Sequence, residues 1–186
     1  MLIGERIKRI RNFRHMTQKE LGIALGFSES TASVRIAQYE NNSKLPKKET
    51  AEAISKVLQC NDINFSLNAN LETASSIMMD LFWLEESVGH SMYIFQLEKY
   101  NDPNDSRTAH GQYNDYNFSG IYPPVAIALN YNLINEFMRE WAIRYQELKS
   151  KKISYDEYFE WKINWPASCD DGGRFEPSYK WHRDSK

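Results

Sequence analysis

The stretch from Thr17 to Glu40 constrains the fold of this chain more than any other, and it reads TQKELGIALGFSESTASVRIAQYE. Thr17 followed three residues later by Glu20 forms a capping box, which predicts the first turn of a helix. Gly26 stands where that helix is expected to end, because C-terminal caps favour a residue that tolerates a positive φ angle. Ser28 can then cap a second helix. A helix, a glycine-containing turn and a second helix form a helix-turn-helix, whose second helix enters the major groove of DNA.

Apolar residues at helical spacing predict further helices on both sides of this motif. The predicted helices of the N-terminal region are Ile3–Arg14, Thr17–Leu25, Ser28–Glu40, Lys47–Leu58 and a short helix within Asn61–Asn70. In the first of these, Ile3, Ile7 and Ile10 mark the inner face. Arg9 and Arg11 lie off this stripe, where they either form a solvated face or contact DNA phosphates.

The second helix of the motif carries the side chains that are expected to read DNA. With its apolar residues turned inward, the outward face holds Val34 and Gln38, with Arg35 at its edge. Gln38 can pair with adenine, Arg35 with guanine or phosphate, and Val34 can touch a thymine methyl group. Basic residues of the following loop are expected near phosphates. The full predicted set of DNA-contacting residues is Gln18, Ser28, Ser30, Thr31, Val34, Arg35, Gln38, Lys44 and Lys47.

Charge and aromatic residues are unevenly distributed along the chain. Residues 1–60 contain 11 Lys and Arg against 6 Asp and Glu, whereas the remainder contains 12 against 19. Of the aromatic residues, only Phe13, Phe27 and Tyr39 fall in the first sixty positions. A basic module joined to an acidic, aromatic-rich remainder predicts two domains, with a nucleic-acid face on the first alone.

The N-terminal residues IGERIKRIRNFRHMTQKELGIALGF, followed by IAQYENN, a proline and AEAISKVL, resemble the Cro/cI-like helix-turn-helix regulators, the XRE family. The resemblance covers about residues 3–67 and rests on Gln18, Leu21, Gly26, Glu40, Pro46 and the Ile54–Leu58 segment. It implies a five-helix, lambda-repressor-like DNA-binding domain that is usually dimeric and reads operators with its third helix. By the same resemblance, Gln18 contacts the DNA backbone. The run LKSKKISYDEYFEWKINWP also looks like the C-terminal helix pair of a bacterial subgroup of these regulators, often encoded near mobile elements.

This sequence departs from the family pattern at two places. Gly22 stands where the family commonly has alanine, which costs about 1 kcal/mol of helix propensity unless close packing requires a glycine. The spacing from Ser28 to Glu40 is twelve residues, about one helical turn longer than is common in the family. Either the third helix is extended at its start, or the turn is enlarged and the helix begins near Thr31–Ser33.

The remainder of the chain predicts a second region with both helices and strands. Expected helices are Leu71–Ser87, Tyr131–Ser150 and Ser154–Trp165, and expected strands are Ser91–Tyr100 and Val125–Leu129, on either side of a long polar loop. The predicted fold is therefore mainly α: a five-helix DNA-binding domain over residues 1–68, then a smaller α+β domain over residues 69–166. Residues 167–186 are expected to form a loose tail.

No pattern of residues in the sequence indicates an enzyme. Metal-binding or nucleophile motifs are missing, the four histidines are isolated, and no glycine-rich phosphate loop occurs, so we expect no catalytic residue, cofactor or metal. Cys60 and Cys169 are expected to be reduced thiols. No apolar run is long enough for a membrane span, and the N-terminus lacks a signal core, so a cytoplasmic location is expected.

The sequence therefore predicts a DNA-binding transcriptional regulator, most simply a repressor that acts as a homodimer on double-stranded DNA. The alternative is an antitoxin-like interaction module whose C-terminal domain binds a partner protein, with DNA binding for autoregulation. A small-molecule effector of the aromatic-rich domain is a third reading.

Overall fold

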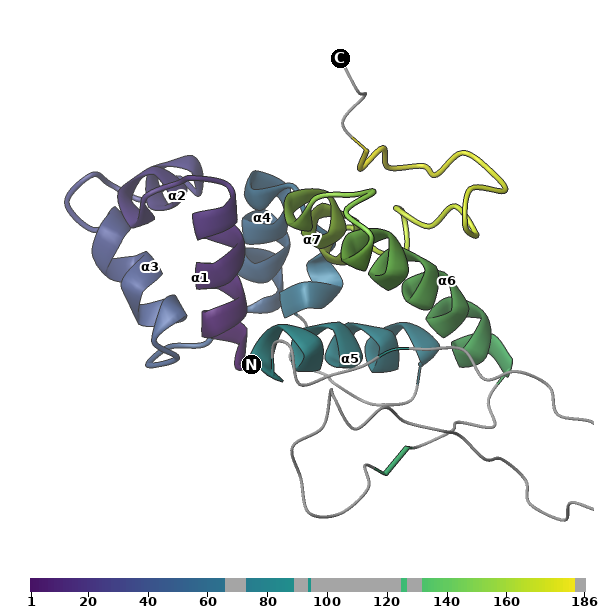
Figure 1. Cartoon of the computed structure of the whole chain (residues 1–186). Coiled ribbons are helices and arrows are strands. Elements are labelled where there is room, and N and C mark those ends of the chain that lie inside the picture. Colours follow the sequence, from purple (N-terminus) through teal and green to yellow (C-terminus); the bar gives the residue numbers. More distant parts are fainter. Residues whose placement is uncertain (66–72, 89–93, 95–124, 127–131, 183–186) are drawn as a thin grey trace, which may run out of the picture.

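The computed structural model describes residues 1–65, 73–88, 94, 125–126 and 132–182, and all regular structure in these ranges is helical (Figure 1). The elements are α1 (Ile3–Phe13), α2 (Gln18–Ala24), α3 (Ala32–Glu40), α4 (Lys48–Leu58), the 3-10 helix η1 (Asp62–Phe65), α5 (Ala74–Val88), α6 (Asn132–Lys149) and α7 (Tyr155–Ile163). Within the described ranges, none of these helices combines the length and apolar character needed to span a bilayer.

Local sequence signals account for the start and end of α2. The Thr17 hydroxyl accepts a hydrogen bond from the Glu20 N–H at 3.1 Å, and the Thr17 N–H donates to the Glu20 carboxylate at 2.7 Å, so the predicted capping box forms. The Thr17 N–H and the Thr17 hydroxyl both donate to the Glu20 carboxylate and hold the pKa of Glu20 below its ordinary value. Gly26 follows the helix with a φ of 83°, a conformation that side chains with a Cβ rarely adopt.

The structure decides between the two predicted starts of the third helix. Helix α3 begins at Ala32, and Thr31 is the residue that precedes it. The Ser28 carbonyl accepts hydrogen bonds from the Thr31 and Ala32 N–H groups at 3.0 and 2.9 Å, so these residues form a turn. The four additional residues therefore enlarge the turn, and the start at Ser28 is wrong.

Close contact between α2 and α3 explains Gly22. A Cβ atom on Gly22 would lie 2.7 Å from the Cα, the Cβ and the carbonyl oxygen of Ala32. Because backbone atoms cannot yield at that distance, only glycine fits between the two helices. The close packing outweighs the lost helix propensity at this position.

The C-terminal helices pack around a cluster of aromatic rings. Phe82 of α5 lies edge-on to Trp141 of α6, Trp161 of α7 and Trp165, with ring centroids 5.0, 5.2 and 5.9 Å away. Each of these three tryptophans is fully buried. Such edge-to-face contacts add about 0.5–1.5 kcal/mol per pair to the gain from burial.

The predicted α+β character of residues 69–166 finds no support. The expected strands lie at 91–100 and 125–129, where the structure describes only Ile94, Val125 and Ala126 and assigns none of them to a strand. The helices of this region follow the sequence prediction more closely. Helix α7 begins with a second capping box, in which the Ser154 hydroxyl accepts from the Glu157 N–H at 3.2 Å.

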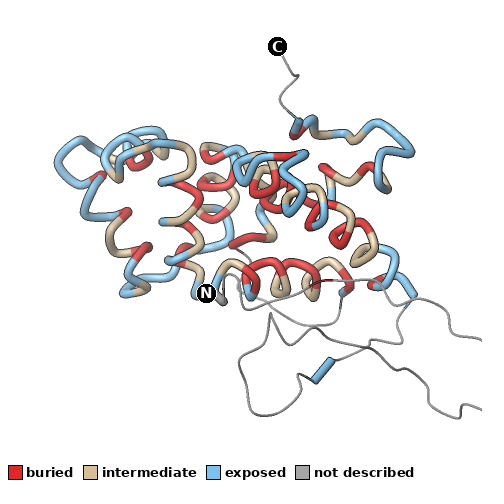
Figure 2. Tube along the Cα trace, viewed as in Figure 1, coloured by how far each residue is buried: buried red, intermediate tan, exposed pale blue. Residues whose placement is uncertain are grey.

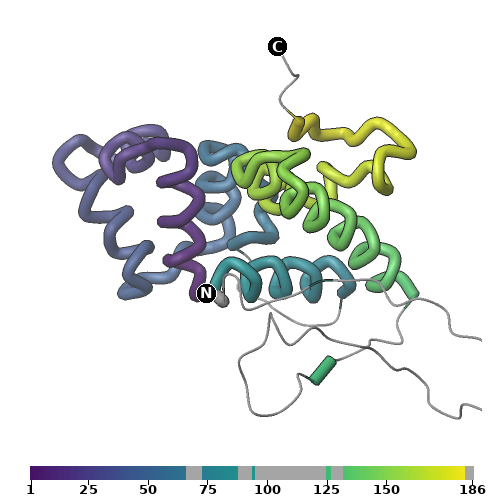
Figure 3. The backbone as a smooth tube through the Cα atoms, viewed as in Figure 1, coloured from purple at the N-terminus to yellow at the C-terminus, as the bar shows by residue number. Residues whose placement is uncertain are grey.

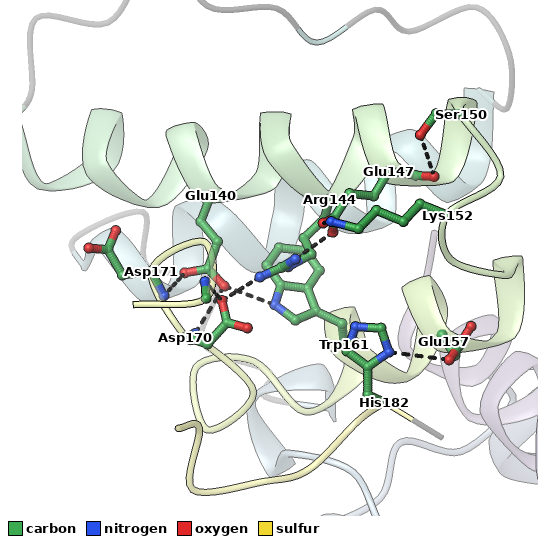
Figure 4. Close-up of polar contacts among 11 residues, drawn as sticks. Glu140, Arg144, Glu147, Ser150, Lys152, Glu157, Trp161, Asp170, Asp171 and His182 are labelled. Atoms are coloured by element: carbon green, nitrogen blue, oxygen red, sulfur yellow. Dashed lines mark hydrogen bonds and ion pairs between the residues drawn. The ribbon is translucent and has the colours of Figure 1, made fainter. Parts of the chain in front are cut away.

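Residues after α7 fold back onto α6 and α7, as Figure 4 shows. The buried Glu140 carboxylate accepts hydrogen bonds from the Trp161 indole and from the N–H groups of Asp170 and Asp171, all at 3.1–3.2 Å. Burial raises the pKa of Glu140 despite these donors. Arg144 forms an ion pair with Asp170. The described part of the segment predicted as a loose tail is thus held to α6 by several polar contacts.

Helix α1, purple in Figure 3, lies between α3 and the C-terminal helices. On the C-terminal side, two of its arginines and the residue that follows the helix meet carboxylates: Arg6 pairs with Asp80 at 3.1 Å, Arg9 with Glu86 at 3.5 Å, and Arg14 with Glu160 at 2.6 Å. Arg9, for which the sequence leaves a solvated face and a phosphate contact as the two alternatives, also donates to the Tyr155 hydroxyl at 2.7 Å. Basic α1 and the acidic C-terminal helices compensate one another's charge.

We predict that Arg14→Ala lowers the free energy of unfolding by about 1–3 kcal/mol in urea denaturation. The Arg14 side chain is only 18% exposed, and besides Glu160 it donates to the carbonyls of Leu58 and Gln59, at 2.7 and 2.6 Å. A matched control is Arg174→Ala, whose side chain is 69% exposed and pairs with Asp171. It should change stability by less than about 0.5 kcal/mol. Equal losses in the two variants would contradict a structural role for the Arg14 contacts.

Candidate nucleic-acid interface

Helix α3 presents an exposed face opposite its buried residues. Ala32, Ile36 and Tyr39 are buried against the rest of the N-terminal helices (Figure 2). On the opposite side Val34 is 59% exposed, and Arg35 is also exposed. The predicted inward and outward positions of this helix are therefore confirmed for these residues.

The residues before and after α3 extend this face. Ser28, Ser30 and Thr31 of the enlarged turn are exposed, and the Ser28 hydroxyl lies 3.2 Å from that of Ser30 and 2.7 Å from that of Thr31. Their hydroxyls can rotate to donate to phosphate or base acceptors. The turn thus places three of the predicted residues in one hydroxyl cluster at the start of α3.

Gln38 and the loop after α3 are joined through the backbone. Gln38 is half-buried, and its carbonyl accepts hydrogen bonds from the Lys44 N–H at 3.1 Å and the Ser43 hydroxyl at 3.2 Å. These bonds hold the loop against the end of the helix. Lys44 and Lys47 are exposed, and neither has a carboxylate partner among the described residues.

Gln18 is placed differently from the other predicted residues. Its amide nitrogen donates to the Glu40 carboxylate at 2.8 Å, and its amide oxygen accepts from the Ser33 hydroxyl at 3.4 Å. Gln18 is therefore half-buried and joins α2 to both ends of α3. Ser33, which was not among the predicted residues, is exposed beside it.

A buried ion pair fixes α3 against α1. The Arg11 guanidinium donates to both carboxylate oxygens of Glu40, at 2.5 and 3.1 Å, and to the Met16 carbonyl at 2.6 Å. Both side chains are less than 10% exposed. The alternative prediction of a phosphate contact for Arg11 is therefore wrong, since its charge is used inside the domain. Sequence periodicity placed Arg11 off the apolar stripe but could not show that it faces Glu40.

Several cations of the N-terminal region have no ion-pair partner in the part of the chain that the structure describes. The arginines of α1 are neutralised by carboxylates, whereas Arg35, Lys44 and Lys47 have no such partner in the part of the chain that the structure describes. Unpaired cations beside an exposed helix attract a polyanion and are suited to phosphate contacts.

Comparison with known proteins gives one match. Residues 7–62 match the family model described as Helix-turn-helix, which extends from within α1 to the first residue of η1. The comparison supports the resemblance to the Cro/cI-like class. No curated protein and no solved structure matches the chain.

We predict that Glu40→Gln lowers the free energy of unfolding by about 3–5 kcal/mol, because it leaves the Arg11 charge buried without a counter-charge. Guanidinium denaturation measures the loss. Glu29→Gln is the matched control, because Glu29 is 80% exposed and its pair with Lys19 at 3.5 Å lies on the surface. The double variant Arg11→Met with Glu40→Leu should recover part of the lost stability. An unchanged stability in Glu40→Gln would refute the role of the pair.

Proposed function

We propose that this chain, whose residues 7–62 form a helix-turn-helix domain of the Cro/cI-like class, is a sequence-specific DNA-binding transcriptional regulator that reads the major groove with α3. The observation that carries the proposal is the exposed face of α3, bordered by cations that have no carboxylate partner among the residues that the structure describes. A major groove about 12 Å wide admits one such helix, and its exposed side chains then meet base edges.

The placement of charge supports this orientation on DNA. Arg6, Arg9 and Arg14 pair with carboxylates of α5 and α7, and α1 lies between these helices and α3 (Figure 1). The C-terminal helices therefore leave the face of α3 uncovered in the described part of the chain. We assign phosphate contacts to Lys44 and Lys47 and to the hydroxyls of the enlarged turn, and base contacts to Val34 and Gln38.

We further propose that the protein binds DNA as a homodimer and acts as a repressor. A single helix contacts only a few base pairs, so two copies on half-sites one DNA turn apart supply the specificity that a genome demands. We assign dimerisation or effector sensing to the region beyond residue 68. A dimer bound across a promoter excludes polymerase from the same DNA, and repression follows from occupancy alone.

We predict salt-sensitive binding of the full chain to a DNA fragment from upstream of its own gene, measured by titration at two salt concentrations. Each phosphate contact should add about 0.9 to the slope of log K against log salt. The absence of salt-sensitive binding to any upstream fragment would contradict the proposed function.

We further predict that Gln38→Ala relaxes sequence preference at one base pair, at a cost of about 1–3 kcal/mol on the preferred DNA. Competition titrations against single-base variants of the bound fragment measure this preference. Gln146→Ala, at an exposed position of α6, is the matched control and should leave the preference unchanged. An equal loss of affinity on all DNA sequences would refute a base-reading role for Gln38.

A further inference from the structure

Arg35 differs from every other arginine that the structure describes. The other seven, from Arg6 in α1 to Arg174 near the C-terminus, each have a carboxylate oxygen within 3.5 Å of a guanidinium nitrogen. Arg35 has no carboxylate partner and donates no side-chain hydrogen bond within the described ranges. Its five N–H donors are therefore available to a ligand.

The contact that the structure gives to the Arg35 side chain is aromatic. The guanidinium carbon lies 5.3 Å from the centroid of the Phe27 ring. Phe27 is half-buried, packs against the core, and donates its N–H to the Gly22 carbonyl at 3.0 Å, so the ring is anchored. A cation over an aromatic face is attracted by the ring quadrupole, and the attraction uses none of the guanidinium donors.

The enlarged turn is what brings Phe27 to Arg35. The two residues are eight positions apart, which would separate them by about 12 Å along the axis of one continuous helix. Because the chain turns at Ser28–Thr31 before α3 begins, the ring instead lies beside the second turn of α3. The contact therefore depends on the turn between α2 and α3.

We propose that Arg35 is a specificity-determining residue that reads a guanine in the operator, and that Phe27 is its positioning residue. The proposal rests on the proposed function. Arginine donates two parallel hydrogen bonds to the O6 and N7 atoms of guanine, and no other base presents this pair of acceptors in the major groove. Contact with the ring restricts the rotamers of a long exposed side chain, so less conformational entropy is lost when the base is bound.

A guanine fits this site better than a phosphate does. Phosphate contact needs only a positive charge near the backbone, and Lys44 and Lys47 already provide such charges beside α3. Arg35 lies within the exposed face itself, next to Val34, and its donors form a planar fork. Lysine cannot reproduce that fork, which gives a clean substitution for the test.

The test uses the full-length chain and the upstream fragment that it binds, with each G·C pair replaced in turn by A·T. For wild-type protein, one replacement should weaken binding about 5- to 150-fold. Arg35→Lys keeps the charge but loses the planar fork, so it should discriminate between the original and the replaced fragment less than the wild type does. The matched control Arg174→Lys, at an exposed position, should discriminate as the wild type does.

The role of Phe27 is tested by variants that keep an apolar side chain in the turn. Phe27→Leu should lower the guanine discrimination about two- to fivefold, whereas Phe27→Tyr, which retains the ring, should preserve it.

A second measurement uses the wild-type protein and is therefore independent of folding defects in the variants. In its NMR spectrum the Nε–H proton of Arg35 should be shifted upfield, by the ring current of Phe27, relative to that of Arg174.

Three results would overturn the assignment. If Arg35→Lys weakens binding equally on all fragments, Arg35 contacts phosphate. If Arg35→Lys retains the wild-type discrimination, another residue reads the guanine. If the Arg35 resonance is unshifted, or if Phe27→Leu discriminates as the wild type does, Phe27 does not position Arg35. Wild-type protein that binds no DNA would instead contradict the proposed function, which separates the two claims.

Discussion

The pairing of the α1 arginines with carboxylates on two sides is the interaction on which the rest of this structure depends. Arg11 of α1 meets Glu40 of α3, and Arg14, directly after α1, meets Glu160 of α7, so this segment joins the helix-turn-helix to the C-terminal helices. Both pairs are at least partly removed from water, where a lone charge is costly and a paired one is tolerated. The orientation of α3 relative to the C-terminal helices therefore follows from contacts made by α1.

Local signals in the sequence were sufficient for α1, α2 and α4, since caps and apolar spacing act within a few residues. They were also sufficient for the outward positions Val34 and Arg35, which follow from the helical period. They were not sufficient for the start of α3, because Ser28 is a good cap in sequence whereas α3 begins at Ala32. The partners of the arginines depend on contacts between residues far apart in the chain, which periodicity does not show.

The ion pairs leave the two sides of the N-terminal helices with different net charge. Basic residues that face the C-terminal helices are neutralised there, while those beside α3 have no described partner. A net charge of −2 thus conceals a locally cationic face, and the protein can attract DNA on one side without being basic as a whole. The acidic C-terminal helices then serve as the counter-charge of α1.

The central claim, that α3 reads DNA sequence, is tested most directly by selecting bound duplexes from a random pool with the full-length chain. The account predicts enrichment of a two-fold-symmetric site whose half-sites are centred about 10–10.5 base pairs, or a multiple of that spacing, apart. A pool that remains random after repeated rounds, although the protein retains DNA under low salt, would contradict it.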